Sequence, residues 1–461
     1  MTEATRNQAC PCGSGLRFKQ CHGRSESRSA PQAEGDRSLR YAQLMAQALA
    51  HRQHGGFDEA QRDYHAAREM DPGRPDAMAM LAEMYREQGD FSRAKVSILE
   101  ALELTGWKSP THRRSLAAII EDESALPGPD AEGEPDRRSL ARSDVRPAPA
   151  NAESPQVSVI VPCYRHVRYV EDALCSVYRQ SYRHIGLIVV DSGSDDGSAD
   201  AIRRCLRDSP FSHHFVARKH LNAVDAINEA VELAAGAFVC LLNADDCMHE
   251  DRMLDMVTDI ADTGAQWGFS SVECIDADGN AIDPLRNRFV YDLCCAAGEV
   301  AAGPTVGFSL LTQNVAASSG NLFLSRELFR VLGGFRPYRH VYGWDLCLRA
   351  LPLAEPVFVR RAVYYYRIHD GNRPEDAFDA ARTEATEVCS RYLRWACTVQ
   401  DPVSALAPCA ANWRVEFSKL MLETGLADLV DIPALRALAQ LGATPTRPPQ
   451  PTQPVTIIRQ S

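Results

Sequence analysis

The 461-residue sequence has no long apolar run and no excess of positive charge. None of its apolar stretches reaches the roughly 18 residues that a membrane-spanning helix needs, and its amino terminus lacks the apolar core of a signal peptide. The formal net charge of -11 argues against a general nucleic-acid-binding protein, which would carry a basic face. These absences predict a cytoplasmic protein with no transmembrane segment and no nucleic-acid partner.

Regularly spaced cysteines are also scarce. Of the 15 cysteines, only those near the amino terminus form a motif, and the odd total does not suggest a set of disulfides. Others, such as Cys175, Cys205 and Cys240, fall within apolar helix or strand patterns, where a free cysteine behaves as a small buried hydrophobic residue. This pattern predicts a reducing compartment.

The amino-terminal motif, residues 6–23, consists of two close pairs of metal-binding side chains separated by a glycine-rich turn. Its candidate ligands are Cys10, Cys12, Cys21 and His22. Four such ligands suit tetrahedral Zn2+, whose binding would supply the folding energy of so short a segment. The alternative is a disordered tail with unpaired cysteines. The segment resembles the SEC-C motif, a small zinc module of bacterial proteins that contacts other macromolecules.

A repeat of 34 residues follows in the segment 36–106. Phe57 is matched by Phe91 and Ala60 by Ala94, which is the spacing of tetratricopeptide-like helix pairs. Only about two units are visible, so the repeats are expected to dock on another part of the chain or on another subunit. Their role as a peptide-binding groove, a spacer or a dimerisation surface stays open, and a protein partner could bind through them or through the zinc motif.

Two segments have compositions typical of disorder. Residues 107–156 are predicted to be a largely disordered linker, because the stretch 126–156 is rich in Pro, Ala, Gly and charged residues without a sustained apolar period. The Pro- and Gln-rich tail 443–461 is predicted to be mobile. Residues 374–442 have a helical pattern and are predicted to form a carboxyl-terminal helical extension.

Residues 157–373 alternate between apolar strands and helical patterns. The strands 157–161, 187–190 and 237–242 each run into polar residues, among them Pro162, Tyr164, Asp191, Asp195, Asn243, Asp245 and Asp246. In an open parallel sheet, ligands bind at the carboxyl ends of the strands, so these residues are expected to share one site. The acidic loop after the second strand lacks the lysine of a phosphate-cradling loop and suits a base and ribose hydroxyls better. The alternative for the last two aspartates is a solvated pair that caps the following helix.

The ordered motifs Val-Pro-Cys-Tyr, Val-Val-Asp-Ser-Gly-Ser-Asp-Asp-Gly-Ser and Leu-Asn-Ala-Asp-Asp resemble family 2 glycosyltransferases of the GT-A fold. The resemblance runs from about Val157 to Asn372. It implies an α/β domain with a mostly parallel sheet flanked by helices, which transfers a sugar with inversion from a nucleotide-diphosphate sugar to an acceptor hydroxyl. It also implies that the base and ribose lie near Pro162, Tyr164, Asp191 and Asp195.

The family's Asp-x-Asp metal motif corresponds here to Asn243, Ala244 and Asp245. Asn243 stands where the first Asp is usual, so Asp245 is the expected anionic ligand of Mg2+ or Mn2+, with Asp246 behind it. A diphosphate and waters supply further oxygen ligands, so one or two protein carboxylates suffice. The late Tyr-Arg-Ile-His that ends at His369 resembles a family motif whose His completes the metal site or contacts the diphosphate.

The acceptor side resembles the family in its strand 318–324, its short helix 326–332 and the Gly-Gly-Phe turn that follows. Gly343 occupies the position of the family's usual general base. Asp345, the nearest remaining carboxylate, is predicted as the catalytic base. The alternatives are a structural Asp at a helix start, another acid in its place, or an acceptor that needs no strong base.

The leading prediction is therefore a metal-dependent inverting glycosyltransferase, a hexosyl- or related transferase, with a protein or cell-surface glycan as acceptor. The helical repeats favour a protein over a lipid, because such repeats bind peptides well. One alternative is a catalytically weakened scaffold that binds nucleotide-sugar, which Asn243 and Gly343 support. The other is an adaptor whose zinc motif and repeats carry the function.

Overall fold

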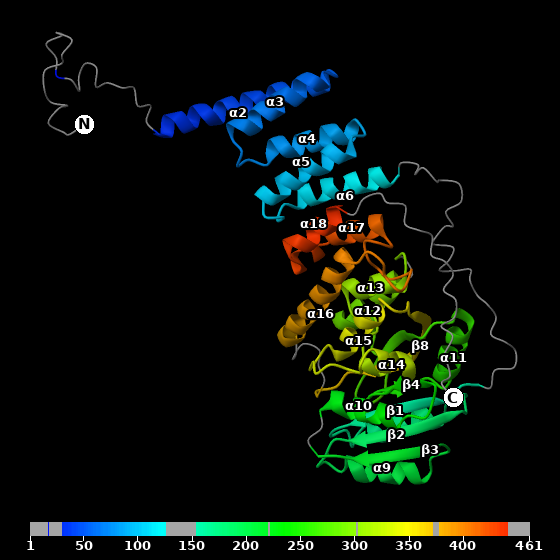
Figure 1. Cartoon of the computed structure of the whole chain (residues 1–461). Helices are drawn as coiled ribbons and strands as arrows, with labels where there is room; N and C mark the ends of the chain where they lie inside the picture. The colour runs from blue at the N-terminus through cyan, green and yellow to red at the C-terminus, as the bar shows by residue number, and fades with distance from the viewer. Residues whose placement is uncertain are drawn as a thin grey trace. The chain divides into compact units, whose positions relative to one another are not determined.

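The computed structural model describes Arg17 and residues 30–125, 154–219, 222–300, 303–371 and 378–440 (Figure 1). The chain divides into two compact units at Ala125 and Leu126, and each is described by itself. The predicted zinc ligands lie outside the described residues, as do most of the predicted linker and the whole of the predicted tail.

The first unit consists of consecutive helices, each packed on its neighbour. They are α2 (Ala30–Gln53), α3 (Phe57–Met70), α4 (Asp76–Glu87), α5 (Phe91–Leu104) and α6 (Pro110–Ser124). Ala60 and Ala94, which are equivalent in the repeat, are both completely buried, and so are Tyr64 and Ile98 one helical turn further on. Small residues at these positions let paired helices approach closely, which explains why the 34-residue spacing recurs.

The prediction of a linker from residue 107 onwards was wrong for its first part, because α6 occupies this stretch. Ser109 caps the helix by accepting a hydrogen bond from the His112 backbone N–H at 3.3 Å. Leu116, Ile119 and Ile120 then bury one face of it. Their spacing of three and four residues is the helical signal that the charged composition further along the chain obscured.

The second unit is built on an eight-stranded sheet with the order β3-β2-β1-β4-β7-β6-β8-β5. Its strands are β1 (Val157–Cys163), β2 (Ile185–Asp191), β3 (Ser212–Ala217), β4 (Phe238–Leu241), β5 (Cys247–Met248), β6 (Trp267–Ile275), β7 (Phe323–Ser325) and β8 (Val357–Arg367). The strands β1 to β4 pair in parallel, as do β6 and β8, whereas β7 runs antiparallel to β4 and β6, and β5 runs antiparallel to β8. The sheet is therefore mixed, and the mostly parallel arrangement predicted from the sequence is found among its amino-terminal strands, β1 to β4.

The second unit also contains helices, of which some pack on the sheet and the carboxyl-terminal ones pack on other helices (Figure 1). They are α8 (Val170–Tyr178), α9 (Ser198–Arg207), α10 (Ala223–Leu233), α11 (Arg252–Thr263), α12 (Arg288–Glu299), α13 (Val306–Thr312), α14 (Arg326–Val331), α15 (Tyr342–Ala350), α16 (Phe378–Thr398), α17 (Arg414–Glu423) and α18 (Ile432–Gln440). The helix α8 shows why they pack: Val170, Leu174 and Val177 recur at helical spacing and are completely buried against the apolar strands. No helix among those described is both long and apolar enough to span a bilayer.

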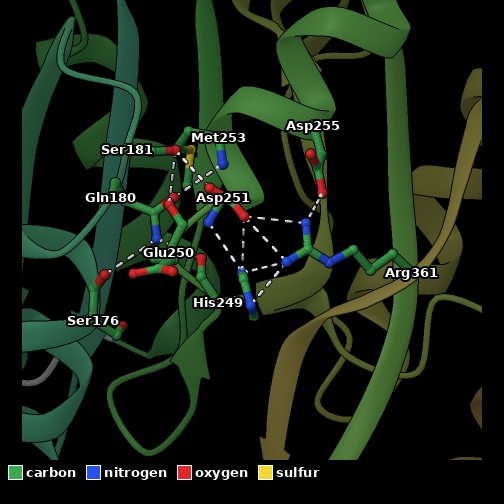
Figure 2. A network of polar contacts seen from close by, with 9 residues as sticks. All are labelled: Ser176, Gln180, Ser181, His249, Glu250, Asp251, Met253, Asp255 and Arg361. Atoms are coloured by element: carbon green, nitrogen blue, oxygen red, sulfur yellow. Dashed lines mark hydrogen bonds and ion pairs between the residues drawn. The ribbon is translucent and has the colours of Figure 1, made fainter.

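A polar network fixes β5 and the start of α11, which follow directly after Asp245 and Asp246 (Figure 2). The Gln180 side chain donates to the His249 carbonyl at 2.7 Å and accepts from the Met253 backbone N–H at 3.0 Å. On the other side, the Arg361 guanidinium on β8 donates to the Asp251 carboxylate at 3.1 Å. The segment is thus held from two directions, which limits the movement of the acidic strand end before it.

Candidate active site

The carboxyl ends of β1, β2 and β4 form one edge of the parallel half of the sheet. Cys163 at the end of β1 pairs with Asp191 at the end of β2, and Ile160 pairs with Leu241 at the end of β4. Two of the predicted donor-binding residues, Pro162 and Asp191, are among the last residues of β1 and β2, and the others follow the strand ends. The register thus brings together side chains that lie up to about 80 residues apart in the sequence, as the strand-end rule predicts.

Asp191 has one carboxylate oxygen without a partner. The side chain is 2% exposed, and its Oδ2 accepts hydrogen bonds from the backbone N–H groups of Gly193 at 3.2 Å and Ser194 at 3.1 Å. Its Oδ1 is buried and has no hydrogen-bond partner in the described part of the chain. Leaving a buried acceptor unsatisfied is costly, so this oxygen would gain from a donor on a bound ligand.

The loops after β1 and β2 are joined at the rim of the site. The Arg165 backbone N–H donates to Ser194 Oγ at 2.8 Å, and its guanidinium pairs with Asp195 Oδ2 at 2.6 Å and lies over the Tyr164 ring. Tyr164 and Asp195 are exposed. An exposed ion pair contributes little to stability, so these side chains can exchange their partners for those of a ligand.

Asp246 is engaged within the protein on both oxygens. Its Oδ2 accepts from the Tyr364 hydroxyl at 2.6 Å and from Asn243 Nδ2 at 3.1 Å, and its Oδ1 accepts from the Arg367 backbone N–H at 2.8 Å. Burial, together with the charge of Asp245, raises the pKa of Asp246 well above its usual range. Asp246 therefore ties the end of β4 to the end of β8 and is poorly placed to bind a metal ion.

Asp245 has the opposite electrostatic environment. Burial alone would raise its pKa, but the hydrogen bond with His369 and the nearby charges of His166 and His369 lower the pKa below the usual value. His369 Nε2 lies 3.1 Å from Asp245 Oδ2, and the Asp245 backbone carbonyl accepts from Arg367 Nε at 2.7 Å. Asp245 is thus the ionised member of the pair, with its backbone fixed.

His166 was missed by the sequence-based prediction. The structure brings its ring to Asp245 and His369, and one ligand atom from each of the three lies within 4.8 Å of the others. One carboxylate and two imidazoles are a suitable ligand set for a divalent cation, so the residues present fit the metal that the resemblance implies. The one feature of the sequence that could have indicated His166 is its position, because it follows the end of β1 by only three residues.

Asn243 donates hydrogen bonds from Nδ2 to Asp246 Oδ2 at 3.1 Å and to Ser318 Oγ at 2.9 Å. A carboxylate at this position could not donate, and it would face a second buried carboxylate. The Asn that replaces the first Asp of the Asp-x-Asp pattern therefore supplies a hydrogen-bond donor that Asp246 accepts.

The substitution Asn243→Asp is expected to lower the free energy of unfolding by about 1–3 kcal/mol, because it replaces a partly buried donor by a second acceptor. The loss should grow as the pH rises and both carboxyl groups lose their protons, because burial and the charge of Asp245 raise the pKa of Asp246. Urea unfolding measures it. Asn280→Asp is the matched control, because Asn280 donates to Asp276 at 3.2 Å in solvent, where water screens the repulsion. Equal stability of Asn243→Asp and the parent protein would contradict this account.

The predicted strand 318–324 is shorter in the structure, because residues 319–321 form a 3-10 turn and only β7 is extended. A Cβ at Gly320 would overlap the Tyr364 hydroxyl that donates to Asp246. The turn thus has room for glycine alone, and Ser318 beside it accepts from Asn243. The 319–321 turn thus packs beside Tyr364 and Asn243, the two side chains that donate to Asp246.

Asp345 lies on α15 among three guanidinium groups. Its carboxylate is 2.8 Å from Arg349, 3.5 Å from Arg336 and 3.6 Å from Arg391, and the residue is 2% exposed. Arg349 also donates to the carbonyls of Leu332 and Gly334. This geometry favours the structural alternative for Asp345, which anchors the Gly-Gly-Phe turn, over the predicted role as catalytic base.

Gly343 faces a different neighbour, because residues two apart on a helix do not share a face. A Cβ at Gly343 would lie 3.1 Å from the Ser319 Cβ, beside the turn that contacts Asn243. The Asp345 side chain therefore does not point where a side chain at position 343 would point. Asn228 on α10 also holds the Gly-Gly-Phe turn, because its side chain donates to the Phe335 carbonyl at 3.0 Å and accepts from the Phe335 backbone N–H at 2.9 Å.

Comparison with protein-family models gives three matches. The glycosyl transferase family 2 model matches residues 158–332, the SEC-C motif matches residues 6–24, and a tetratricopeptide repeat matches residues 51–105. The order of these matches agrees with the order of the motifs found in the sequence.

Among curated proteins, a Bacillus subtilis glycosyltransferase named for teichuronic acid biosynthesis, TuaG, is 30% identical over 129 residues, which are 28% of this chain and 51% of that protein. An uncharacterized glycosyltransferase of Nostoc is 28% identical over 256 residues, which are 52% of this chain and 74% of that protein. The amylovoran biosynthesis glycosyltransferase AmsB of Erwinia amylovora is 30% identical over 100 residues, which are 21% of this chain and 33% of that protein. The chain thus spans about half the length of TuaG and about a third of AmsB.

Solved structures show a more distant likeness. The mannosyltransferase of Pyrobaculum calidifontis in complex with GDP-Man and Mn2+ is 20% identical, with a TM-score of 0.40 and coverage of 72% of this chain and 90% of that one. Residues 1–349 of S. aureus TarS in complex with UDP-GlcNAc are 15% identical, with a TM-score of 0.40 and coverage of 61% and 78%. Residues 158–332 are thus similar to family 2 glycosyltransferases, and they are preceded by segments similar to a SEC-C motif and to a tetratricopeptide repeat.

Proposed function

We propose that this protein is a metal-dependent inverting glycosyltransferase, which moves a sugar from a nucleotide-diphosphate sugar to an acceptor hydroxyl. The observation that carries the proposal is the pairing of an ionised Asp245 with His369 at the same sheet edge as Asp191. A nucleoside diphosphate presents donors at one end and negative charge at the other. The site offers an unsatisfied acceptor at Asp191 and metal-binding groups at Asp245 and His369.

Each part of the donor has a proposed partner. Asp191 accepts a hydrogen bond from the base or ribose through its Oδ1, while Pro162, Tyr164 and Asp195 border the nucleoside. Asp245 and His369 hold a divalent cation, Mg2+ or Mn2+, which when bound stabilises the negative charge on the departing nucleoside diphosphate. Asp246 and Asn243 support this arrangement from behind, because their hydrogen bonds fix the strand end on which Asp245 stands.

The proton of the acceptor hydroxyl is proposed to leave by a route other than Asp345. Both oxygens of that carboxylate already face guanidinium groups within 3.6 Å, Oδ2 towards Arg349 and Oδ1 towards Arg336 and Arg391. Gly343 leaves the usual base position without a side chain. A protein or a cell-surface glycan is the proposed acceptor, and the helical repeats favour the protein.

A donor screen tests the proposal. The full chain is incubated with Mn2+ and a panel of UDP-, GDP- and dTDP-sugars, with and without sugar and peptide acceptors, and products are identified by mass spectrometry. Release of nucleoside diphosphate or transfer from at least one donor is expected. Tight nucleotide-sugar binding by calorimetry with no product from any donor would instead favour the scaffold alternative. The absence of both binding and product would overturn the proposal.

A further inference from the structure

We propose that His166 is the third protein ligand of the cation in this site, and that the resulting set of one carboxylate and two imidazoles selects Mn2+ over Mg2+. The inference rests on the proposed function only in taking the cation site from it. It adds a ligand that the sequence motifs do not include, and it predicts the identity of the metal.

The three candidate ligand groups already stand close together. His369 Nε2 is 3.1 Å from Asp245 Oδ2, and the ligand atoms of His166, Asp245 and His369 all lie within 4.8 Å of one another. Two atoms that bind one cation at about 2.1 Å lie at most about 4.2 Å apart. Small rotations of the side chains are therefore enough to close the set around an ion.

The chain holds His166 in this place through the backbone. The His166 N–H donates to Ser198 Oγ at 3.0 Å, the next residue, Val167, donates to Asp196 Oδ2 at 3.0 Å, and the preceding Arg165 donates to Ser194 Oγ at 2.8 Å. Three consecutive residues are thus anchored to the loop after β2 and to the first turn of α9. A ligand fixed in this way loses little conformational freedom when the ion binds.

The rings are also held by one another. The His166 ring meets the His369 ring edge to face, with centroids 6.2 Å apart and an interplanar angle of 83°. Tyr169 packs against His369 at 4.7 Å, and the Arg367 guanidinium lies over Tyr169 at 5.1 Å. Aromatic packing alone would also place His166 here, and a measurement of metal binding separates the two roles.

The preference for Mn2+ follows from the atoms that are left for the metal. Both carboxylate oxygens of Asp246 accept hydrogen bonds from Tyr364, Asn243 and Arg367. Asp245 is therefore the residue that contributes a carboxylate to the cation, and the two histidines contribute nitrogen. Mg2+ demands near-ideal octahedral geometry and is bound mainly through oxygen, whereas Mn2+ also binds oxygen well but, as a first-row transition-metal ion, accepts imidazole nitrogen more readily. A second imidazole in the set therefore favours Mn2+ more than Mg2+.

The test is a titration of the full chain with Mn2+ alone, followed by electron paramagnetic resonance and by calorimetry, and then a competition with Mg2+. Each sample first receives one equivalent of Zn2+ for the amino-terminal motif, and mass spectrometry checks that no second zinc is bound. The parent protein is expected to bind Mn2+ at least about 10-fold more tightly than Mg2+. His166→Ala is expected to weaken Mn2+ binding by about 10- to 100-fold while changing Mg2+ binding much less.

Two further variants keep the result interpretable. His166→Gln retains the size of the side chain and should show the same loss of Mn2+ affinity if the imidazole is a ligand. His214→Ala removes an exposed histidine from β3 and should bind Mn2+ like the parent protein. Thermal unfolding of each variant checks that it is folded.

Unchanged Mn2+ affinity in both His166 variants would overturn the inference, even if sugar transfer is found. Equal affinity of the parent protein for Mn2+ and Mg2+ would overturn the predicted selectivity. Loss of Mn2+ affinity in His166→Ala without transfer from any donor would support the inference and count against the proposed function instead, so the two failures can be told apart.

Discussion

Asp245→Ala is expected to reduce sugar transfer by about 100- to 1000-fold or more, the range found when one group that stabilises developing charge is removed. The physical reason is that Asp245 is the ionised carboxylate of the site, with a pKa lowered by the hydrogen bond with His369 and the charges of the two histidines despite its burial. Without it, the proposed cation would keep only nitrogen ligands from the protein. Initial rates at saturating donor, measured with Mn2+, test the expectation.

The control for this variant is Asp200→Asn on α9. Asp200 is 75% exposed and pairs with Arg203 at 2.8 Å on the protein surface. Exposed pairs contribute little to stability, and this one lies on the solvent-exposed face of α9, so the control should keep the parent rate. Turnover by Asp245→Ala equal to that of Asp200→Asn would refute the metal assignment.

Asp246→Ala is expected to damage the fold rather than the chemistry, with a loss of about 3 kcal/mol in the free energy of unfolding. The substitution leaves three donors without their acceptor: the Tyr364 hydroxyl, the Asn243 amide and the Arg367 backbone N–H. Each buried group left unsatisfied costs about 1–3 kcal/mol, and partial relaxation or entry of water recovers some of the sum. Urea unfolding followed by tryptophan fluorescence measures the loss.

Two comparisons separate this structural role from a general effect of removing acid. Asp246→Asn keeps the shape and one oxygen acceptor, so it should lose less stability than Asp246→Ala. Asp245→Ala should lose only about 1 kcal/mol or less, because removing its charge relieves the repulsion that raises the pKa of Asp246 and offsets the lost hydrogen bond to His369. A larger loss for Asp245→Ala than for Asp246→Ala would reverse the roles assigned to the two residues.

Adjacent aspartates with opposite roles illustrate why the site could be located from the sequence but not fully assigned. The location was predictable because strands and helices have local periods, and ligand-binding residues of a parallel sheet follow its strand ends. Asp191, Asp245 and His369 were all found through short motifs in a fixed order. The partners of Asp246, in contrast, lie 118 and 121 residues further along the chain, at Tyr364 and Arg367.

His166 and Asp345 show two ways in which prediction from the sequence fails: one residue was missed, and the other was assigned a role that its contacts do not favour. His166 belongs to no recognised motif, and only the packing of the loop after β1 brings it beside Asp245. Asp345 lies only two residues after Gly343, the family's usual position for the base. On α15 this spacing points its side chain towards Arg336, Arg349 and Arg391. Distance along the chain was thus a poor guide to distance from the site in both cases.

The sequence by itself determined the order of the segments that match family models, the parallel part of the sheet and the edge at which the candidate site lies, because these depend on patterns within a few tens of residues. Only the tertiary structure decided which of two neighbouring carboxylates faces a ligand, why Asn243 replaces an acid, and which histidines can meet around one cation. Those properties depend on burial and on hydrogen-bond partners from distant strands, and they arise only when β4 and β8 lie in the same folded sheet.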